Sequence, residues 1–307
     1  MEKELLKVLE GYFTESELNR LPKEYGGERI FSTPLIGVAS GDDPIYYKYK
    51  EVVGPEHLTP IEMWKASGQQ EIDNKKLRVL SIVFPYNSII RNKAKNFVKL
   101  HHITIPSEYY SIGRNYANEF KTFVMKQCVK YFQGKGYKAV AGMLSKAYTI
   151  IMKDTFYSTW SERHIAFAAG LGTFSLHEGF ITEVGCNVRL ASVITNAPLK
   201  VTLRKSDNPY SNCLFFAQGT CKSCVEKCPV KAISEDGHDK LKCSYYGQKI
   251  AIKMSHRIGS YLKPHVRRIN GILRPPTLPV GCAFCQFDVP CMDKNPTASN
   301  KFSKQEE

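Results

Sequence analysis

The chain of 307 residues lacks long uninterrupted apolar runs. None approaches the roughly 18 to 20 residues that a helix needs to cross a bilayer, so we expect no membrane span and no membrane partner. The first residues, MEKELLKVLEGYF, also lack the apolar core and small-residue cleavage site of a secretory signal, which predicts a cytoplasmic location. Hydrophobic residues nevertheless make up 43% of the chain, which is enough to build a full core.

Cysteine is scarce in most of the sequence and dense at its end. Residues 1–200 contain only Cys128 and Cys186, and ten cysteines in 307 residues is too few for a disulfide-stapled miniprotein. The other eight lie within the last hundred residues: Cys213, Cys221, Cys224, Cys228, Cys243, Cys282, Cys285 and Cys291. Two 4Fe-4S clusters with four cysteine ligands each require this number of thiolates.

The spacing of these cysteines favours clusters over zinc. Cys221, Cys224 and Cys228 precede Pro229 in the bacterial ferredoxin pattern, in which the cysteine before the proline ligates the other cluster. Zinc is the alternative, because two Cys-x2-Cys pairs, 221/224 and 282/285, could form one tetrahedral site. Zinc would leave four cysteines without a role. For Cys128, on the apolar face of an expected helix, and for Cys186 we predict purely structural roles.

The hydrophobic pattern predicts an α/β domain followed by a smaller cysteine-rich one. Residues 77–84 read as a strand buried on both faces, 114–134 as a helix and 137–144 as a strand, an order that points to a partly parallel sheet. Further expected elements are an amphipathic helix at 2–20, a strand at 34–41, a helix at 162–169, and strands at 180–182 and 188–195. The rest of 22–75 reads as loops. We therefore expect an α/β domain over 1–200 and a bacterial-ferredoxin-like two-cluster domain over 201–307.

The net charge of +14 requires an explanation. Two oxidised clusters would lower it to about +10, which is still strongly basic. Three explanations remain open: a polyanion such as tRNA, an acidic electron donor such as ferredoxin or flavodoxin, or solubility alone. Many of the basic residues lie between 249 and 274, where a helix would place them on one face.

Several motifs, taken in chain order, resemble the epoxyqueuosine reductase family and, more distantly, the reductive dehalogenases. They are Tyr110-Ser-Ile-Gly113-Arg114, Glu162-Arg163-x6-Gly170-Leu171-Gly172, Ser192-Val-Ile-Thr195 and Gly281-Cys282-x2-Cys285. The resemblance covers roughly residues 105 to 295. It implies an iron-sulfur oxidoreductase that also binds cobalamin, and for some members a tRNA substrate.

The resemblance also implies how the cysteines divide. Carried over residue by residue, one cluster takes Cys213, Cys221, Cys224 and Cys291, and the other takes Cys228, Cys243, Cys282 and Cys285. Two departures concern loop length. Gln218 stands where the family has its leading cysteine, so Cys213 must loop back, and five residues rather than three separate Cys285 from Cys291.

The implied active site departs further from the family. Counting back from Arg163, the catalytic aspartate would fall at Phe156. The nearest candidates for a proton donor are Asp154 and Tyr157, although a lone tyrosine is also a common core residue. The resemblance places Arg163, Gly170, Gly172, Ser192 and Thr195 around the cobalamin. A Gly-x-Gly after a helix is equally explained as a helix stop.

Two functional classes follow. The first is a corrinoid-type reductase that passes electrons through two clusters to cobalamin and a substrate in the α/β domain. The second is a non-catalytic 4Fe-4S electron-transfer protein without cobalamin, which the missing aspartate favours.

Overall fold

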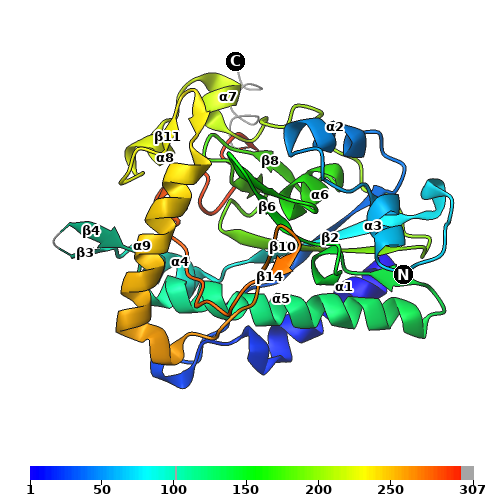
Figure 1. Cartoon of the computed structure of the whole chain (residues 1–307), viewed down its shortest axis with the longest axis horizontal. Helices are drawn as coiled ribbons and strands as arrows, with labels where there is room; N and C mark the ends of the chain where they lie inside the picture. Colours follow the sequence, from blue (N-terminus) through cyan, green and yellow to red (C-terminus); the bar gives the residue numbers. More distant parts are fainter. Residues whose placement is uncertain (101, 299–307) are drawn as a thin grey trace, which may run out of the picture.

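The computed structural model describes residues 1–100 and 102–298, and its centre is a four-stranded sheet. The strands lie in the order β1 (Leu35–Ser40), β2 (Arg78–Pro85), β10 (Val188–Thr195) and β5 (Ala139–Val140), and every neighbouring pair is antiparallel (Figure 1). The expected parallel pairing is therefore wrong for this sheet. Strands β2 and β5 do run in the same direction, but β10 lies between them and pairs with both.

Helices cover both faces of this sheet. α1 (Glu2–Glu15) and the long α5 (Glu108–Gly134) pack on one face, and α2 (Ile45–Val52), α3 (Pro60–Ala66) and α6 (Glu162–Ala168) pack on the other. Along β2, Leu80, Ile82 and Phe84 join the first layer, whereas Val79 and Val83 face the second side. This confirms the prediction of a strand buried on both faces.

Local capping explains where several predicted boundaries were wrong. α1 ends at Glu15 rather than at residue 20, because Ser16 leaves the helical conformation and caps a short 3-10 turn. α5 begins at Glu108, six residues earlier than expected, where the Ser107 side chain accepts the Tyr110 N–H at 3.2 Å. The segment read as loops contains α2 and α3, and α3 carries a capping box of Thr59 and Glu62 with Pro60 at its first position.

The remaining strands are short, and α9 is the one long helix among the remaining helices of the described residues. A second sheet contains β14 (Ile272–Leu273), β13 (Arg268–Ile269), β6 (Ile150–Met152) and β7 (Phe156–Ser158), in that order. Three hairpins are β3 (Val98–Leu100) with β4 (Ile103–Ile105), β8 (Gly172–Phe174) with β9 (Phe180–Thr182), and β11 (Ile233–Ser234) with β12 (Gly237–His238). The other helices are α4 (Ser88–Ala94), α7 (Leu214–Gln218), α8 (Ser223–Glu226) and α9 (Lys240–Ile258).

The cysteine-rich segment shares the main core. Ile250, Met254 and Ile258 of α9, with Phe284 and Phe287, belong to the same apolar cluster as α1 and α5. In Figure 1, α9 runs across one end of α5. The basic segment at 249–274 is α-helical as far as Ile258, forms a 3-10 turn over Gly259–Tyr261 and then continues into the β13–β14 hairpin. The division at residue 200 stays a prediction. Within the described residues, no helix is both long and apolar enough to cross a membrane.

Candidate metal centre and adjoining cavity

Four cysteines from separate chain segments converge on one small pocket. Cys213, Cys221, Cys224 and Cys291 line it together with His177. Burial, together with the neighbouring Cys291, Cys213 and Cys221, raises the pKa of the Cys224 thiol to about 12. The structure thus brings together the four residues that the family resemblance assigned to one cluster.

Hydrogen bonds to a neighbouring hairpin and one short helix hold Cys213 at this pocket. The Asn212 N–H donates to Thr173 Oγ1 at 2.9 Å, and its Nδ2 donates to the Ile181 carbonyl at 2.9 Å, which ties the segment to the β8–β9 hairpin. One turn of helix, α7, follows Cys213, and Gly219 at φ 68° then reverses the chain toward Cys221. This turn compensates for the absence of a cysteine at Gln218.

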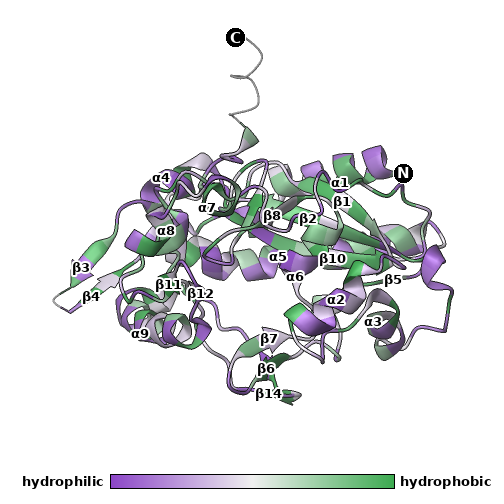
Figure 2. Ribbon diagram, turned by 90° about the horizontal axis from the view of Figure 1, so that it is seen from above, coloured by the Kyte–Doolittle hydropathy of each residue, from purple (hydrophilic) through white to green (hydrophobic). Residues whose placement is uncertain are grey.

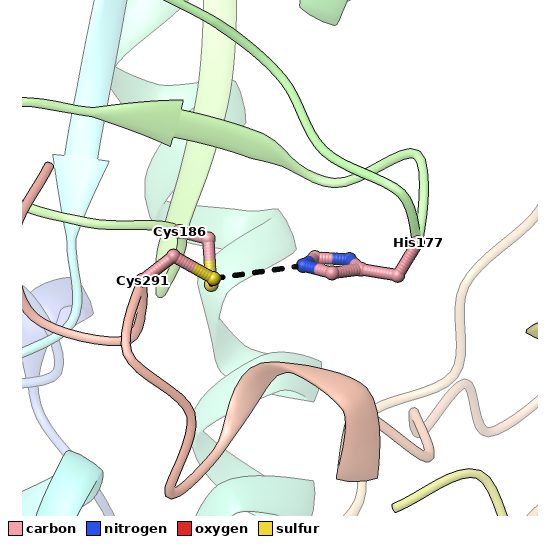
Figure 3. A group of neighbouring side chains, drawn as sticks. All are labelled: His177, Cys186 and Cys291. Atoms are coloured by element: carbon pink, nitrogen blue, oxygen red, sulfur yellow. Dashed lines mark hydrogen bonds between the residues drawn. The ribbon is translucent and has the colours of Figure 1, made fainter. Parts of the chain in front are cut away.

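Cys291 lies beside two further potential ligands. Its Sγ is 3.8 Å from the Sγ of Cys186 and 4.0 Å from Nε2 of His177 (Figure 3). The hydrogen bond with Cys186, together with the facing His177, lowers the pKa of the Cys291 thiol to about 5. Because Gly179 N–H donates to His177 Nδ1 at 3.2 Å, the ring proton lies on Nε2 and faces the Cys291 sulfur. Cys186, for which we predicted a structural role, is therefore in contact with a candidate ligand.

The turn before β10 holds the Cys291 loop in place. The Cys186 N–H donates to the Cys291 carbonyl at 2.8 Å, and Asn187 Nδ2 donates to the Gln286 carbonyl at 2.8 Å. Gly185 has a φ of 86°, and a Cβ there would lie 2.2 Å from the Met292 carbonyl oxygen. Only glycine fits this close approach.

The other four cysteines, Cys228, Cys243, Cys282 and Cys285, lie near enough to one another to interact electrostatically, and we call them the second group. Burial raises the pKa of the Cys282 thiol to about 12, with further contributions from Cys243 and Cys228. Burial also raises the pKa of Cys285, which interacts with these three thiols and with Cys224 of the first group. Cys285 therefore lies where the two groups meet. Cys128, in contrast, is 1% exposed within the apolar core, and burial raises its pKa to about 12.

The donor set fits two iron-sulfur clusters. Each group supplies four thiols, the ligand type and number that a 4Fe-4S cluster takes. A tetrahedral zinc site takes the same donors but would need only one of the two groups.

A polar cavity of about 390 Å³ adjoins the cysteines. Its wall includes Cys186, which contacts Cys291, and Gln286, which follows Cys285. The charged residues in its lining come from α5, α6 and β10: Arg114, Lys121, Glu162, Arg163 and Arg189. α5 and α6 pack on opposite faces of the central sheet, and β10 is one of its strands, so the cavity gathers side chains from both faces (Figure 2).

Glu162 and Lys121 form an electrostatically coupled pair in this cavity. Burial raises the pKa of the Glu162 carboxyl to about 7, although Lys121 opposes the shift. Burial, together with the nearby charge of Arg189, lowers the pKa of the Lys121 ammonium to about 7. Both groups can therefore exchange protons near neutral pH.

The two predicted proton donors lie elsewhere. The Tyr157 hydroxyl donates to the Glu56 carboxylate, and its ring packs over Gly54. Asp154 is exposed in the turn between β6 and β7. Neither residue lines the polar cavity.

The residues predicted to surround cobalamin do not meet around one cavity. Gly170 and Gly172 line a separate cavity of about 350 Å³. Gly170 directly follows α6 at φ 72°, as a helix stop requires. Arg163 lies between the polar cavity and a neighbouring one of about 580 Å³. Ser192 and Thr195 are fully buried in β10, where their hydroxyls bond to Trp160 Nε1 and to the Lys138 carbonyl, both at 2.9 Å.

Sequence reasoning missed Lys121 and Arg189, and it gave Glu162 no role of its own. Lys121 had a visible signal, because it interrupts the apolar face of α5 directly after Phe120 and is only 6% exposed. Nothing in the sequence around Arg189 distinguishes it from a solvated charge on a strand.

No family model matches the chain. One 74-residue segment, 23% of the chain, is 45% identical to the tetrachloroethene reductive dehalogenase of Sulfurospirillum multivorans, of which it covers 14%. The chain thus spans a small part of that relative.

Solved structures similar to this chain include two kinds of enzyme. The epoxyqueuosine reductase from Streptococcus thermophilus has a TM-score of 0.46 and 15% identity, over 96% of this chain and 69% of that one. A reductive dehalogenase described as acting in B12-dependent dehalogenation has a TM-score of 0.41 and 15% identity, over 69% of this chain and 27% of that one. The chain is therefore similar to the two kinds of protein that its motifs resemble.

Proposed function

We propose that the chain is an iron-sulfur oxidoreductase that reduces a substrate held in the polar cavity. The first cluster would take Cys213, Cys221, Cys224 and Cys291, and the second Cys228, Cys243, Cys282 and Cys285. The observation that supports this most is the convergence of Cys213, Cys221, Cys224 and Cys291 on one pocket, where Cys291 contacts Cys186 in the wall of the polar cavity.

Each part of the chain has a role in this proposal. The clusters, when bound, would supply single electrons. Glu162, with a pKa near neutrality, can hold a proton inside the cavity and release it to a reduced substrate. Lys121 and the arginines set the positive potential that draws a substrate in.

Cysteine variants test the ligand assignment. In Cys224→Ser and Cys282→Ser, we expect one cluster to be lost and the other retained, leaving about four irons per chain after anaerobic reconstitution. Cys128→Ser should keep about eight, because Cys128 lies in the apolar core. The same iron content in all three variants would contradict the assignment.

Cobalamin is a further proposal, and its support is the family resemblance. A corrinoid is larger than the polar cavity and would also have to use the neighbouring one, with Arg163 between them. Titration of the anaerobic protein with cobalamin tests this. A stoichiometric absorbance change that Arg163→Ala abolishes would support it, and the absence of any change in a fully cluster-loaded sample would contradict it.

A non-catalytic electron carrier is the second candidate. The positions of Tyr157 and Asp154 outside the cavity favour it, because neither expected proton donor faces a substrate. The two functions differ in their dependence on Glu162. A carrier should pass electrons from dithionite to an artificial acceptor equally well in the wild type and in Glu162→Gln. In a reductase, a substrate bound in the polar cavity should reoxidise the reduced clusters, and Glu162→Gln should slow that reoxidation.

We also propose a docking face for an acidic electron donor such as ferredoxin or flavodoxin. Lys242, Lys249, Lys253 and His256 are exposed along α9, the helix that carries Cys243. tRNA is the alternative polyanion for this face. Binding to either partner should weaken steeply with salt, and an interaction that salt leaves unchanged would remove both.

A further inference from the structure

The polar cavity has an excess of positive charge that the protein does not neutralise. Arg114, Lys121, Arg163 and Arg189 line it, against a single carboxylate, Glu162. Among the ion pairs of the described residues, none involves any of these four cations. Concentrating like charges in a concave site is unfavourable unless an opposite charge joins them.

Burial and the neighbouring cations together lower the pKa values of these side chains. The pKa of Arg189 is lowered, first by burial and then by Arg114. Arg267 is affected in the same way, first by burial and then by Arg114, so the cationic group extends beyond the cavity lining. Lys121 shows the same effect from Arg189.

Hydrogen-bonding capacity is also unused inside the cavity. Arg189 Nε is a buried donor that has no hydrogen-bond partner among the described residues. The Lys121 ammonium has only the Met143 sulfur, at 4.0 Å. Donors that are buried without acceptors are costly, and a bound oxyanion would satisfy them.

Arg114 connects this charge to the second cysteine group. Its Nε lies where a side chain on Gly281 would begin, 2.4 Å from an ideal Cβ, so the guanidinium packs directly on the backbone before Cys282. An anion held by Arg114 would therefore lie near the ligands of the second cluster.

We propose that this cavity binds a substrate through an oxyanion, a carboxylate or phosphate group, held by Arg114, Lys121 and Arg189. Guanidinium groups pair with both anions in a planar, bidentate geometry, and the ammonium adds a third charge. The volume of about 390 Å³ admits a small molecule rather than a macromolecular segment. The inference rests on the proposed function, since it names the substrate class of the same site.

Isothermal titration calorimetry of the anaerobic, cluster-loaded protein with inorganic phosphate and with succinate tests the proposal. We expect one of the two to bind, and which of them binds distinguishes a phosphate from a carboxylate substrate. Arg189→Gln should weaken that binding at least tenfold, because it removes a charge-assisted hydrogen bond. Arg29→Gln, at an exposed arginine outside the cavity, should bind as the wild type does.

The outcomes separate this inference from the proposed function. If neither anion binds while the iron content is full, or if Arg189→Gln binds as tightly as Arg29→Gln, the oxyanion site is wrong and the cluster assignment stands. If the anion binds in an Arg189-dependent way but no clusters assemble, the oxyanion site stands and the redox function is wrong. Lys121→Met is the second variant. If the Arg189→Gln protein fails to fold, the anion binding of Lys121→Met decides between these outcomes.

Discussion

At the scale of single residues, the cysteines were predictable and the cavity was not. Eight thiols in a short segment have few chemical uses, so their number and the Cys228-Pro229 pair already indicated a metal centre. Glu162, Lys121 and Arg189 are far apart in the sequence and come together only through packing. Their environment, rather than their identity, makes them candidates for function.

His177 should tune the first cluster. Its Nε2–H faces the Cys291 sulfur at 4.0 Å, and hydrogen bonds to ligand sulfur stabilise the more negative, reduced cluster. We expect His177→Leu to lower the midpoint potential of that cluster, by about 60 mV if the bond favours the reduced state tenfold. A redox titration followed by electron paramagnetic resonance measures this. Equal shifts in both clusters, or none, would show that His177 does not act on Cys291.

At the scale of elements, glycines mark close backbone contacts. A Cβ on Gly172 in β8 would lie 2.2 Å from the Ile181 carbonyl oxygen in β9. Gly172→Ala should therefore lower the free energy of unfolding by about 3 kcal/mol. Gly134, the last residue of α5, has no such neighbour within 4 Å, and Gly134→Ala should be neutral or stabilise by up to about 1 kcal/mol. Urea unfolding of both variants checks this, and an equal loss in the two would contradict it.

His57 couples stability to pH through the start of α6. Its Nε2 accepts the Ser161 N–H at 3.1 Å, and burial, with the charge of Lys50, lowers its pKa from 6.5 to about 4. The unfolded chain therefore binds a proton below pH 6.5 that the folded protein refuses until about pH 4. Stability should fall across this window by up to about 3 kcal/mol from this group alone.

The variant His57→Gln isolates this effect, because its amide oxygen can accept the same N–H without titrating. We expect the difference in unfolding free energy between the wild type and the variant to shrink as the pH falls from 6.5 toward 4. A difference that stays constant would mean that His57 is protonated in the folded protein as readily as in the unfolded one.

Some elements could be predicted from nearby residues in the sequence, and others could not. β2, β9 and β10 follow from apolar runs, and α6 from the serine before it and the glycine after it, although the Ser161 side chain makes no capping hydrogen bond. The pairing of β10 between β2 and β5 could not be predicted, because register and neighbour order depend on contacts between residues that are far apart in the sequence, such as Val188 with Pro85 and Ile194 with Val140. α3 could have been predicted from Thr59-Pro60-x-Glu62, a signal that the surrounding prolines and glycines obscured.

At the scale of the whole molecule, the cysteine-rich segment and the α/β layers form one packed unit. The shared core joins α9 and Phe284 to α1 and α5, so the candidate metal centre is held in place relative to the polar cavity. This arrangement would suit the proposed electron transfer, because the distance between donor and acceptor is set by packing rather than by a linker.

We propose above all that two groups of four thiols hold two 4Fe-4S clusters. Iron, acid-labile sulfide and zinc should be measured together on anaerobically purified protein. The proposal predicts about eight irons and about eight sulfides per chain, with negligible zinc. Stoichiometric zinc, or four irons or fewer, would contradict it.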